Sequence, residues 1–297
     1  MAVLAMTNPT GILKMEVAKT IEEIRNMVKA ARSEGSKIGL VPTMGALHVG
    51  HISLIEAAAK DCDFVAVSIF VNPTQFGPGE DFEKYPRPLE ADLEICRKAH
   101  VDVVFAPEPE QMYPTENVTW VTVEKLTDSL CGRSRPGHFR GVTTVCAKLF
   151  NIVAPDAAYF GQKDAQQAIV IKRMVADLNM PLEIVVCPTV REPNGLAVSS
   201  RNQYLTARQK QDAANIFKSL QMCRRLIDAG TTETHQIIAE MQKILQQIPS
   251  GQIEYISIVD AETLESIEKI AGKALAAVAV KVGPARLIDN ILVDAGK

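Results

Sequence analysis

The stretch Val41-Pro42-Thr43-Met44-Gly45-Ala46-Leu47-His48-Val49-Gly50-His51 decides the fold of this chain, because it passes from a strand through a tight turn into a helix. The apolar residues 38–41 predict a buried strand that Pro42 and Gly45 end, and residues 52–59 predict a helix. In α/β proteins such a turn often holds phosphate, because a helix start presents unpaired backbone N–H groups and a partial positive charge. We therefore predict an anion-binding site here.

Two histidines in this stretch can add side-chain donors to such a site. His48 and His51 stand three residues apart at the predicted helix start, so both imidazoles can lie on one face and meet one triphosphate. A pair of this kind also arises by chance, or as capping or surface groups. A zinc site is the weaker alternative, because no obvious third ligand and no H-E-x-x-H motif accompanies the pair.

The composition argues against several classes of protein. The 297 residues suffice for one large or two ordinary domains, and a formal net charge of -3 gives no basic field for nucleic acid. No segment approaches the roughly 20 apolar residues of a membrane span, and residues 1–10 lack a signal-peptide pattern. We therefore expect a cytoplasmic protein with no nucleic-acid or membrane partner. The 6 cysteines include no C-x-x-C pair, so we expect reduced, mostly buried thiols.

Alternating strand and helix patterns predict an α/β fold with a Rossmann-like, mainly parallel sheet in the first part of the chain. Near-continuous apolar runs indicate strands covered on both faces, and a period of about 3.6 residues indicates helices. The polar residues before 20 are expected to be loose. Further strands are expected at 64–71, 101–106, 156–160 and 182–187, and further helices at 20–32, 89–100 and 142–153.

The pattern changes after Pro188. Thr206 and Gln209 predict a capping box before a long helix that Gly230 ends. The elements expected after it are a helix at 233–247, a strand at 253–259 and a hairpin of 274–282 and 286–293 that turns at 283–284. We therefore predict a catalytic domain over residues 1–187 and a smaller α+β domain over residues 188–297 that closes on it as a lid.

Polar residues follow one of the predicted central strands. Asn72 and Gln75 come directly after the strand 64–71, at the sheet edge where open α/β folds gather ligands. They are candidates for pocket walls, although Asn-Pro is also ordinary turn chemistry. Asp92 falls in the first turn of the next helix, where it either complements the helix dipole or holds a metal.

Two segments of the first domain combine glycine with cations. Residues 131–142 predict a glycine-rich basic loop that includes Arg135 and enters a helix, and a solvated loop is the alternative. Residues 161–164 open another helix, in which Lys163, Asp164 and Gln167 can all point towards one place. Both segments are suited to anions.

A further basic loop, residues 196–202, lies in the predicted second domain and contains Ser199, Ser200 and Arg201. One triphosphate and one carboxylate would use this loop together with the histidine pair and the two cationic segments. Such a combination indicates an active site that closes when a mobile loop reaches it.

Several of these segments resemble a known family. Residues 43–51 are similar to the HIGH signature of the class I nucleotidylyltransferase superfamily, and residues 198–201 to its KMSKS counterpart. A fuller set resembles the pantothenate synthetase (pantoate–β-alanine ligase) family between about residues 40 and 205. It consists of residues 70–76, 135–142, 160–164, 167 and 199–202.

The resemblance implies a reaction. ATP and pantoate would give pantoyl-adenylate and pyrophosphate, and the amine of β-alanine would then release pantothenate and AMP. The family also implies Mg²⁺ and a homodimer. Adenylylation supplies a good leaving group, and the charge that develops on phosphate needs fixed donors rather than a covalent protein nucleophile.

The resemblance also implies a role for each matched position. His51, as proton donor, His48, Lys163, Ser199, Ser200 and Arg201 would be catalytic, and Asp92 would contact magnesium. Pantoate and β-alanine would be bound by Asn72, Gln75, Arg135 and Gln167. ATP would be bound by Met44, Gly45, Ala46, Leu47, His48, Val49, Gly50, His51, Gly161, Gln162, Lys163, Asp164, Val190, Val198, Ser199, Ser200 and Arg201.

Two positions depart from the family pattern. Gln162 stands where an acid is common, and Val198 stands where Met or Leu is usual. Two other functions stay open for the chain as a whole. Another nucleotidylyltransferase would share the histidines but would not need the two pocket glutamines and an amine substrate. A nucleotide-sensing module would bind ATP without releasing pyrophosphate.

Overall fold

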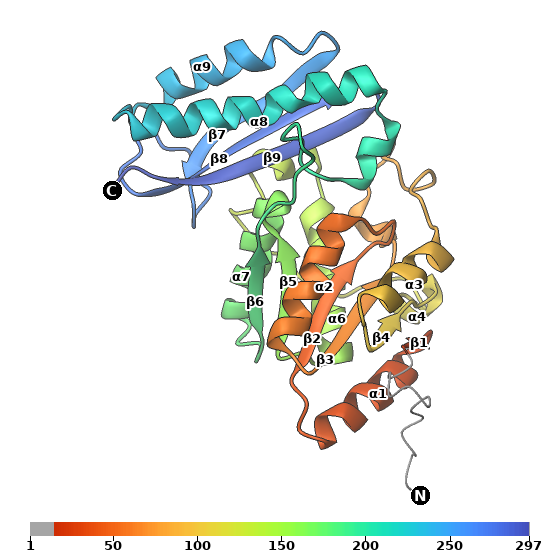
Figure 1. Cartoon of the computed structure of the whole chain (residues 1–297). Helices are drawn as coiled ribbons and strands as arrows, with labels where there is room; N and C mark the ends of the chain where they lie inside the picture. Colours follow the sequence, from red (N-terminus) through yellow and green to blue (C-terminus); the bar gives the residue numbers. More distant parts are fainter. Residues whose placement is uncertain (1–14, 297) are drawn as a thin grey trace, which may run out of the picture. The chain divides into compact units, whose positions relative to one another are not determined.

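The computed structural model describes residues 15–296, which divide into two compact units (Figure 1). The first unit comprises residues 15–122, 140–160 and 174–187, and the second comprises residues 123–139, 161–173 and 188–296. The predicted boundary after residue 187 is the place where the chain enters the second unit for the last time. Two earlier segments, 123–139 and 161–173, also pack with the C-terminal residues.

The first unit contains a six-stranded sheet with the order β1-β4-β3-β2-β5-β6. Strand β2 pairs in parallel with β3 on one side and with β5 on the other, so it lies in the interior of the sheet. This confirms the predicted α/β fold and its parallel sheet. The strands are β1 (Glu16–Ala18), β2 (Ile38–Thr43), β3 (Phe64–Ile69), β4 (Val103–Phe105), β5 (Ala157–Gly161) and β6 (Glu183–Cys187).

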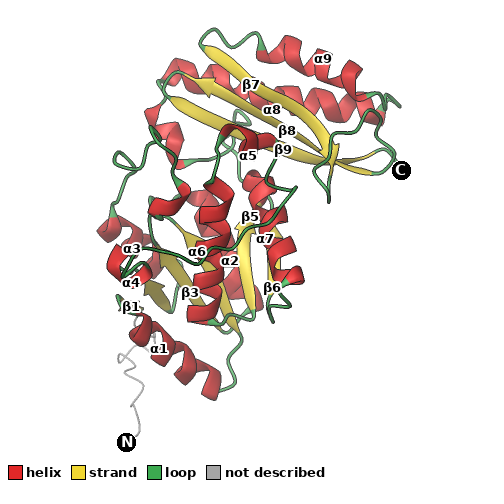
Figure 2. Ribbon diagram, turned by 180° about the vertical axis from the view of Figure 1, so that it is seen from behind, coloured by secondary structure: helices red, strands yellow, loops and turns green. Residues whose placement is uncertain are grey.

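Strand β1 was not predicted from the sequence. It has three residues, too few for a periodic pattern, and it forms only because β4 offers it a parallel edge, with Val17 opposite Val104. Helices lie on both faces of the sheet (Figures 1 and 2). They are α1 (Ile21–Ser33), α2 (Val49–Asp61), α3 (Leu89–Lys98), the short α4 (Pro109–Met112) and α6 (His138–Val153). Helix α7 (Ala165–Asp177) belongs to the second unit up to residue 173.

Apolar side chains from the central strands and the flanking helices form the core of the first unit. Val41 and Val67 from neighbouring strands pack with Ile55 of α2 and Val104 of β4, and all are fully buried. Because both faces of the strands are covered, the runs of apolar residues are continuous rather than alternating. This packing fixes the end of β2, where the turn to α2 begins.

The second unit contains the antiparallel sheet β7-β8-β9, covered by two helices (Figure 1). The strands are β7 (Gly251–Asp260), β8 (Lys273–Val282) and β9 (Ala285–Asp294), and the helices are α8 (Ala207–Asp228) and α9 (Thr234–Leu245). The predicted capping box of Thr206 and Gln209 is present at the start of α8. The predicted hairpin turns at Gly283, whose φ of 54° suits glycine.

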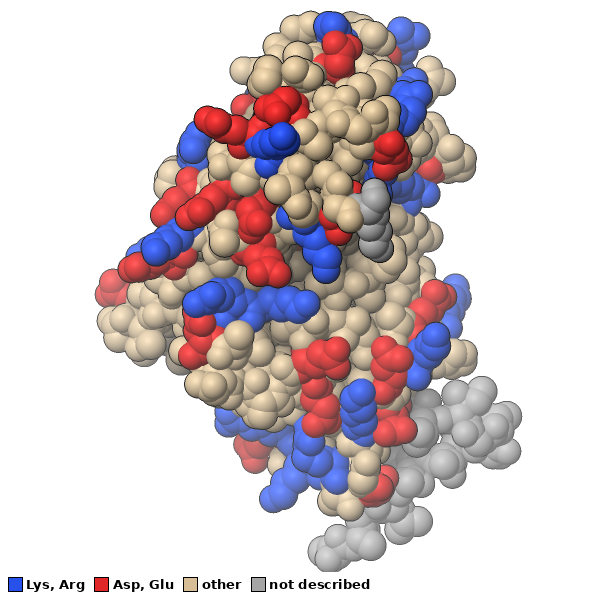
Figure 3. Space-filling model, turned by 90° about the vertical axis from the view of Figure 1, so that its left-hand side faces the viewer, with Lys and Arg blue, Asp and Glu red and all other residues tan. Residues whose placement is uncertain are grey.

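Charges of both signs are interspersed on the face of the molecule in Figure 3, rather than gathered into one basic patch. Within residues 15–296, no helix combines the length and the apolar character that a bilayer crossing requires.

All cysteines are free thiols, and only Cys62 is more than slightly exposed. This confirms the prediction of reduced, mostly buried thiols. Burial raises the pKa of Cys96, of Cys146 and of Cys223 to about 12 in each case. A thiol with such a pKa is almost entirely protonated at neutral pH, so it is a poor nucleophile.

We therefore predict that Cys96, Cys146 and Cys223 escape modification in the folded protein. At about pH 8, a thiol-specific aromatic disulfide should leave these three unlabelled until denaturant is added, because their thiolate form is scarce and sheltered. Peptide mass mapping of labelled protein identifies the sites. Fast labelling of any of the three without denaturant would contradict the prediction.

Candidate active site

His48 and His51 cap the start of α2 reciprocally. The backbone N–H of Gly50 donates to Nδ1 of His48 at 3.2 Å, and the backbone N–H of His48 donates to Nδ1 of His51 at 3.3 Å. The ring centroids are 4.1 Å apart. Because each Nδ1 is an acceptor, the proton of each neutral imidazole is on Nε2. The pair therefore combines two Nε2–H donors side by side, as the spacing predicted.

The backbone of this turn is held by Asp92 of α3. Its Oδ2 accepts the N–H of Ala46 at 2.8 Å, and its Oδ1 accepts the N–H of Leu47 at 2.7 Å. Gly45 has a φ of +81°, and a Cβ built there would lie 2.9 Å from Oδ2 of Asp92. Glycine is therefore required at this position by conformation and by space.

These contacts correct one expectation about the turn. The sequence predicted unpaired backbone N–H groups that would bind an anion, but those of residues 45–48, 50 and 51 already donate within the protein. The reason is that Asp92 and the two imidazoles act as the capping groups of this turn. The backbone N–H groups of these residues are therefore already hydrogen-bonded within the protein.

Asp92 itself is buried, with 1% of its surface exposed. Burial raises its pKa above the ordinary value, while the hydrogen bonds from Leu47 and Ala46 act in the opposite direction. Among residues 15–296 there is no group of three His, Cys, Asp or Glu side chains that could hold a metal ion. The two hydrogen bonds from the turn are the contacts that the structure shows for the Asp92 carboxylate.

Asn72, at the end of β3, is almost fully buried, with 1% exposed. Its Nδ2 donates to Oε1 of Gln75 at 3.1 Å and to the carbonyl oxygen of Gly141 at 3.2 Å. Its Oδ1 accepts from the hydroxyls of Thr74, at 3.0 Å, and Tyr113, at 2.9 Å. Both hydrogens and both lone pairs of the amide are therefore used.

This network orients Gln75 within the turn η1 (Pro73–Gln75). Because Oε1 of Gln75 accepts from Asn72, its Nε2 is the donor end, and it lies 2.9 Å from Sδ of Met44. The amide of Asn72 is engaged in internal bonds, and the expectation that Asn72 forms a pocket wall stays a prediction. Tyr113, which the sequence analysis did not single out, belongs to the same network.

Lys163 and Asp164 belong to the second unit and lie in the 3-10 turn η2 (Gln162–Asp164). Both residues were expected on the α-helix itself, but α7 begins at Ala165 and carries Gln167 in its first turn. The Lys163 ammonium lies 3.8 Å from Oδ1 of Asp164, and its side chain is 21% exposed. This cation therefore remains within reach of solvent.

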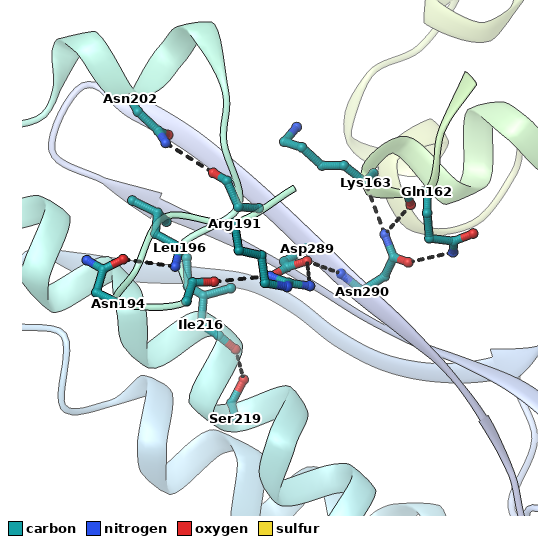
Figure 4. A network of polar contacts seen from close by, with 12 residues as sticks. Gln162, Lys163, Arg191, Asn194, Leu196, Asn202, Ile216, Ser219, Asp289 and Asn290 are labelled. Atoms are coloured by element: carbon teal, nitrogen blue, oxygen red, sulfur yellow. Dashed lines mark hydrogen bonds and ion pairs between the residues drawn. The ribbon is translucent and has the colours of Figure 1, made fainter. Parts of the chain in front are cut away.

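Strand β9 holds η2 through Asn290, as Figure 4 shows. Its Nδ2 donates to the carbonyl oxygens of Gln162 and Lys163, each at 2.9 Å, and its Oδ1 accepts from Nε2 of Gln162 at 2.8 Å. The neighbouring Asp289 accepts both Nη groups of Arg191, at 2.6 and 3.0 Å. Neither β9 residue was among those expected from the sequence.

The segment after Pro188 is more ordered than the loop that the sequence predicted. It begins as a small hairpin in which Arg191 bridges Ala197, and the N–H of Val198 donates to the carbonyl of Val190 at 3.0 Å. Ser199 then caps the turn η3 (Ser200–Tyr204), because its Oγ accepts the N–H of Arg201 at 3.3 Å. Backbone hydrogen bonds and the Ser199 cap thus hold Val190, Val198, Ser199 and Arg201 in one ordered segment.

The predicted glycine-rich basic loop was wrong in its secondary structure. Residues 131–142 belong mostly to two helices, the short α5 (Leu130–Ser134) and the first turn of α6. Arg135 lies between them, with Nη1 at 2.9 Å from Nε2 of His138. The Arg140 guanidinium, 4.5 Å from the ring centroid of Trp120, stacks on that ring. The glycines did not prevent helix formation because α6 packs an apolar face.

Comparison with known proteins shows similarity along nearly the whole chain. The family model described as Pantoate-beta-alanine ligase matches residues 16–292. The pantothenate synthetase of Moorella thermoacetica is 58% identical over 280 residues, which is 94% of this chain and 99% of that protein. That of Acetivibrio thermocellus is 51% identical over 280 residues, with 94% and 100% covered.

Solved structures agree with these sequence matches. The crystal structure of pantothenate synthetase from Thermus thermophilus has a TM-score of 0.89 and 43% identity, covering 93% of this chain and 99% of that one. The pantoate-beta-alanine ligase of Francisella tularensis, complexed with beta-gamma ATP and beta-alanine, has a TM-score of 0.77 and 37% identity. It covers 94% of this chain and 98% of that chain.

The close contact between α6 and the Asn72–Gln75 segment generates a prediction. A Cβ at Gly141 would lie 2.7 Å from Cα of Gln75, so Gly141→Ala must displace that backbone. We expect a loss of about 1–3 kcal/mol in the free energy of unfolding, as for other overpacked sites. Denaturant titration measures this value.

Gly161→Ala is the matched control, because a Cβ there meets nothing within 4 Å and the φ is -83°. Its free energy of unfolding should equal that of the wild type or exceed it by up to about 1 kcal/mol, because alanine restricts the unfolded chain. Equal stability of both variants would show that α6 can move away from the Asn72–Gln75 segment at no cost.

Proposed function

Because the chain belongs to the pantoate-beta-alanine ligase family, we propose that it joins pantoate and β-alanine into pantothenate with ATP as the energy source. The similarity over residues 16–292 is the observation that carries this proposal. The reciprocal capping of His48 and His51 supports it chemically, since it sets both Nε2–H groups at the start of one helix.

The proposed reaction has two steps. In the first, a carboxylate oxygen of pantoate attacks the α-phosphorus of ATP, and the bond to the β-phosphate breaks to release pyrophosphate. In the second, the amine nitrogen of β-alanine attacks the acyl carbon of pantoyl-adenylate and loses a proton, while the bond from that carbon to AMP breaks. Neither step needs a covalent nucleophile from the protein, so positioning and charge compensation supply the catalysis.

Donors and cations of the chain are proposed to stabilise charge on the phosphates. His48 and His51 would donate through Nε2, and His51 is the proposed proton donor to the leaving pyrophosphate. Lys163 would place a positive charge on the transferring group. The remaining proposed nucleotide contacts are Met44, Gly45, Ala46, Leu47, Val49, Gly50, Gly161, Gln162, Asp164, Val190, Val198, Ser199, Ser200 and Arg201.

Pantoate and β-alanine are proposed to be bound by Gln75, Gln167 and Arg135. The support for Gln75 is the orientation of its amide, whose donor end is set by the bond from Asn72. A fixed N–H donor is suited to a hydroxyl or carboxylate oxygen of the substrate. We propose Asn72 as the residue that positions Gln75 rather than as a direct substrate contact.

Magnesium is proposed to accompany the phosphates of ATP. A single buried carboxylate that already accepts two backbone N–H groups does not make a metal site by itself. When bound with ATP, Mg²⁺ would neutralise part of the phosphate charge. A contact from Asp92 to this ion stays a prediction from the family resemblance, and the hydrogen bonds to the turn favour a positioning role.

Asp92→Asn separates these two roles. The amide retains one acceptor oxygen, so one of the N–H groups of Ala46 and Leu47 loses its acceptor, at a cost of about 1–3 kcal/mol in stability. We expect a higher KM for ATP and an unchanged Mg²⁺ concentration for half-maximal rate. A rise in that Mg²⁺ concentration would instead make Asp92 a metal contact.

The proposed function is tested by following pyrophosphate and AMP separately. Purified protein with Mg²⁺, ATP and pantoate should release pyrophosphate, and AMP should follow only when β-alanine is added. His51→Ala and Lys163→Ala should each slow pyrophosphate release by about 10²–10³-fold, because each removes a donor to developing charge.

His235→Ala and Lys60→Ala are the matched controls, since both side chains are exposed. His235 lies on α9, and Lys60 lies in the last turn of α2, at the opposite end of that helix from His51. Both should keep wild-type rates. Pyrophosphate release that does not require pantoate would point to another nucleotidylyltransferase, and ATP binding without any release would point to a sensing module. Wild-type rates in both His51→Ala and Lys163→Ala would remove these residues from the reaction.

Two finer expectations of the resemblance belong to the same proposal. We expect the protein to form a homodimer, which light scattering after gel filtration measures directly. We also expect it to act in the cytoplasm, with pantoate, β-alanine and ATP as its partners.

A further inference from the structure

Two consecutive residues of strand β9 carry buried polar side chains that make long-range bonds. Asp289 is 3% exposed and Asn290 is 4% exposed. A buried polar group stabilises a fold only when its hydrogen bonds are made, so each of these side chains constrains whatever it contacts. Both contact segments that are proposed above to bind ATP (Figure 4).

The orientation of the Asn290 amide follows from its partners. Two carbonyl oxygens, those of Gln162 and Lys163, face one end of the amide at 2.9 Å each, so that end must be the Nδ2 donor. The other end is therefore Oδ1, which needs a donor. Nε2 of Gln162 supplies it at 2.8 Å. A side chain at position 162 that cannot donate would leave this buried oxygen without its hydrogen bond.

Asp289 holds the other segment through Arg191. The carboxylate and the guanidinium form a two-bond pair, and the guanidinium also donates to the carbonyl of Gly195 at 3.2 Å. The same guanidinium stacks on Phe217, 3.7 Å from its ring centroid. Oδ1 of Asp289 further accepts the backbone N–H of Asn290 at 2.8 Å, which joins the two halves of the network.

We propose that Asn290 and Asp289 are positioning residues that tie the Lys163 turn and the segment 190–201 to one strand. Within the second unit, Asn290 of β9 holds the backbone of Lys163, and Asp289 of the same strand holds the hairpin that contains Arg191. In this chain Gln162 is the side chain that completes this support, through the N–H of its amide. This inference rests on the proposed function, since it assigns these contacts to ATP binding.

Exchanges at Gln162 test the inference without removing a core residue. Gln162→Glu places a carboxylate against Oδ1 of Asn290 at about pH 8, and protonation of that carboxylate at lower pH restores a donor. Gln162→Met lacks the donor at every pH. The charged groups near position 162 are Lys163 and Asp164 on its own turn, and Asp289 and Arg191 across β9.

We expect the KM for ATP of Gln162→Glu to rise by about tenfold at pH 8 relative to the wild type. This ratio should fall as the pH is lowered to about 4.3, the ordinary pKa of a glutamate side chain, because the introduced carboxyl group, once protonated, would again donate to Asn290. The ratio for Gln162→Met should stay constant across the same range. Asn290→Ala should raise the KM for ATP further than Gln162→Met, because it also releases the carbonyls of Gln162 and Lys163.

Gln252→Glu, at an exposed position of β7, is the matched control and should match the wild type at every pH. The inference is overturned if both Gln162 variants keep the wild-type KM for ATP, or if the ratio for Gln162→Glu does not change with pH. The proposed function fails in a different way, through a wild-type protein that releases no pyrophosphate with pantoate. Equilibrium ATP binding by the same variants at both pH values then decides the inference by itself.

Discussion

Buried amide and carboxylate groups must have their hydrogen bonds made. The candidate site residues of the first unit and those of the second unit both depend on this constraint. Asp92, Asn72 and Asn290 are each less than 5% exposed. An unsatisfied group at such a depth costs about 1–3 kcal/mol, so each of these side chains can exist in the fold only with its partners in place. The partners are backbone and side-chain groups of the segments that are proposed to meet the substrates.

This constraint separates supporting residues from reacting ones. Asn72 uses its whole amide on Gln75, Gly141, Thr74 and Tyr113, and Asp92 uses both oxygens on one turn. By contrast, the Lys163 side chain is 21% exposed. A side chain that takes part in the reaction must be able to approach the substrate, whereas a side chain that positions it must be fixed in the fold. The supports are therefore polar residues that look functional in a sequence and whose hydrogen bonds within the fold hold neighbouring segments in place.

Much of this arrangement could be predicted from local patterns. Apolar runs indicated the strands of the parallel sheet, and Thr206 with Gln209 marked the start of α8, because these signals depend on neighbours in the chain. Strand β1 could not be found, since three residues carry no period and its pairing partner β4 lies far along the sequence. The helical state of residues 138–142 was missed for a related reason, since glycine argues against a helix only until tertiary packing covers it.

The sequence by itself determined the alternation of strands and helices, the histidine pair at the start of α2 and the family to which the chain belongs. These depend on periodicity and on residue types at fixed spacing, which are properties of the chain alone. Only the tertiary structure decided that Asp92 occupies the N–H groups of the turn and that Asn72 orients Gln75. It also decided that Asp289 and Asn290, about 100 residues from Arg191 and about 130 from Gln162, join those segments. Such hydrogen bonds cannot be predicted from local sequence, because a buried polar group must be hydrogen-bonded and the tertiary structure decides which partner lies within bonding distance.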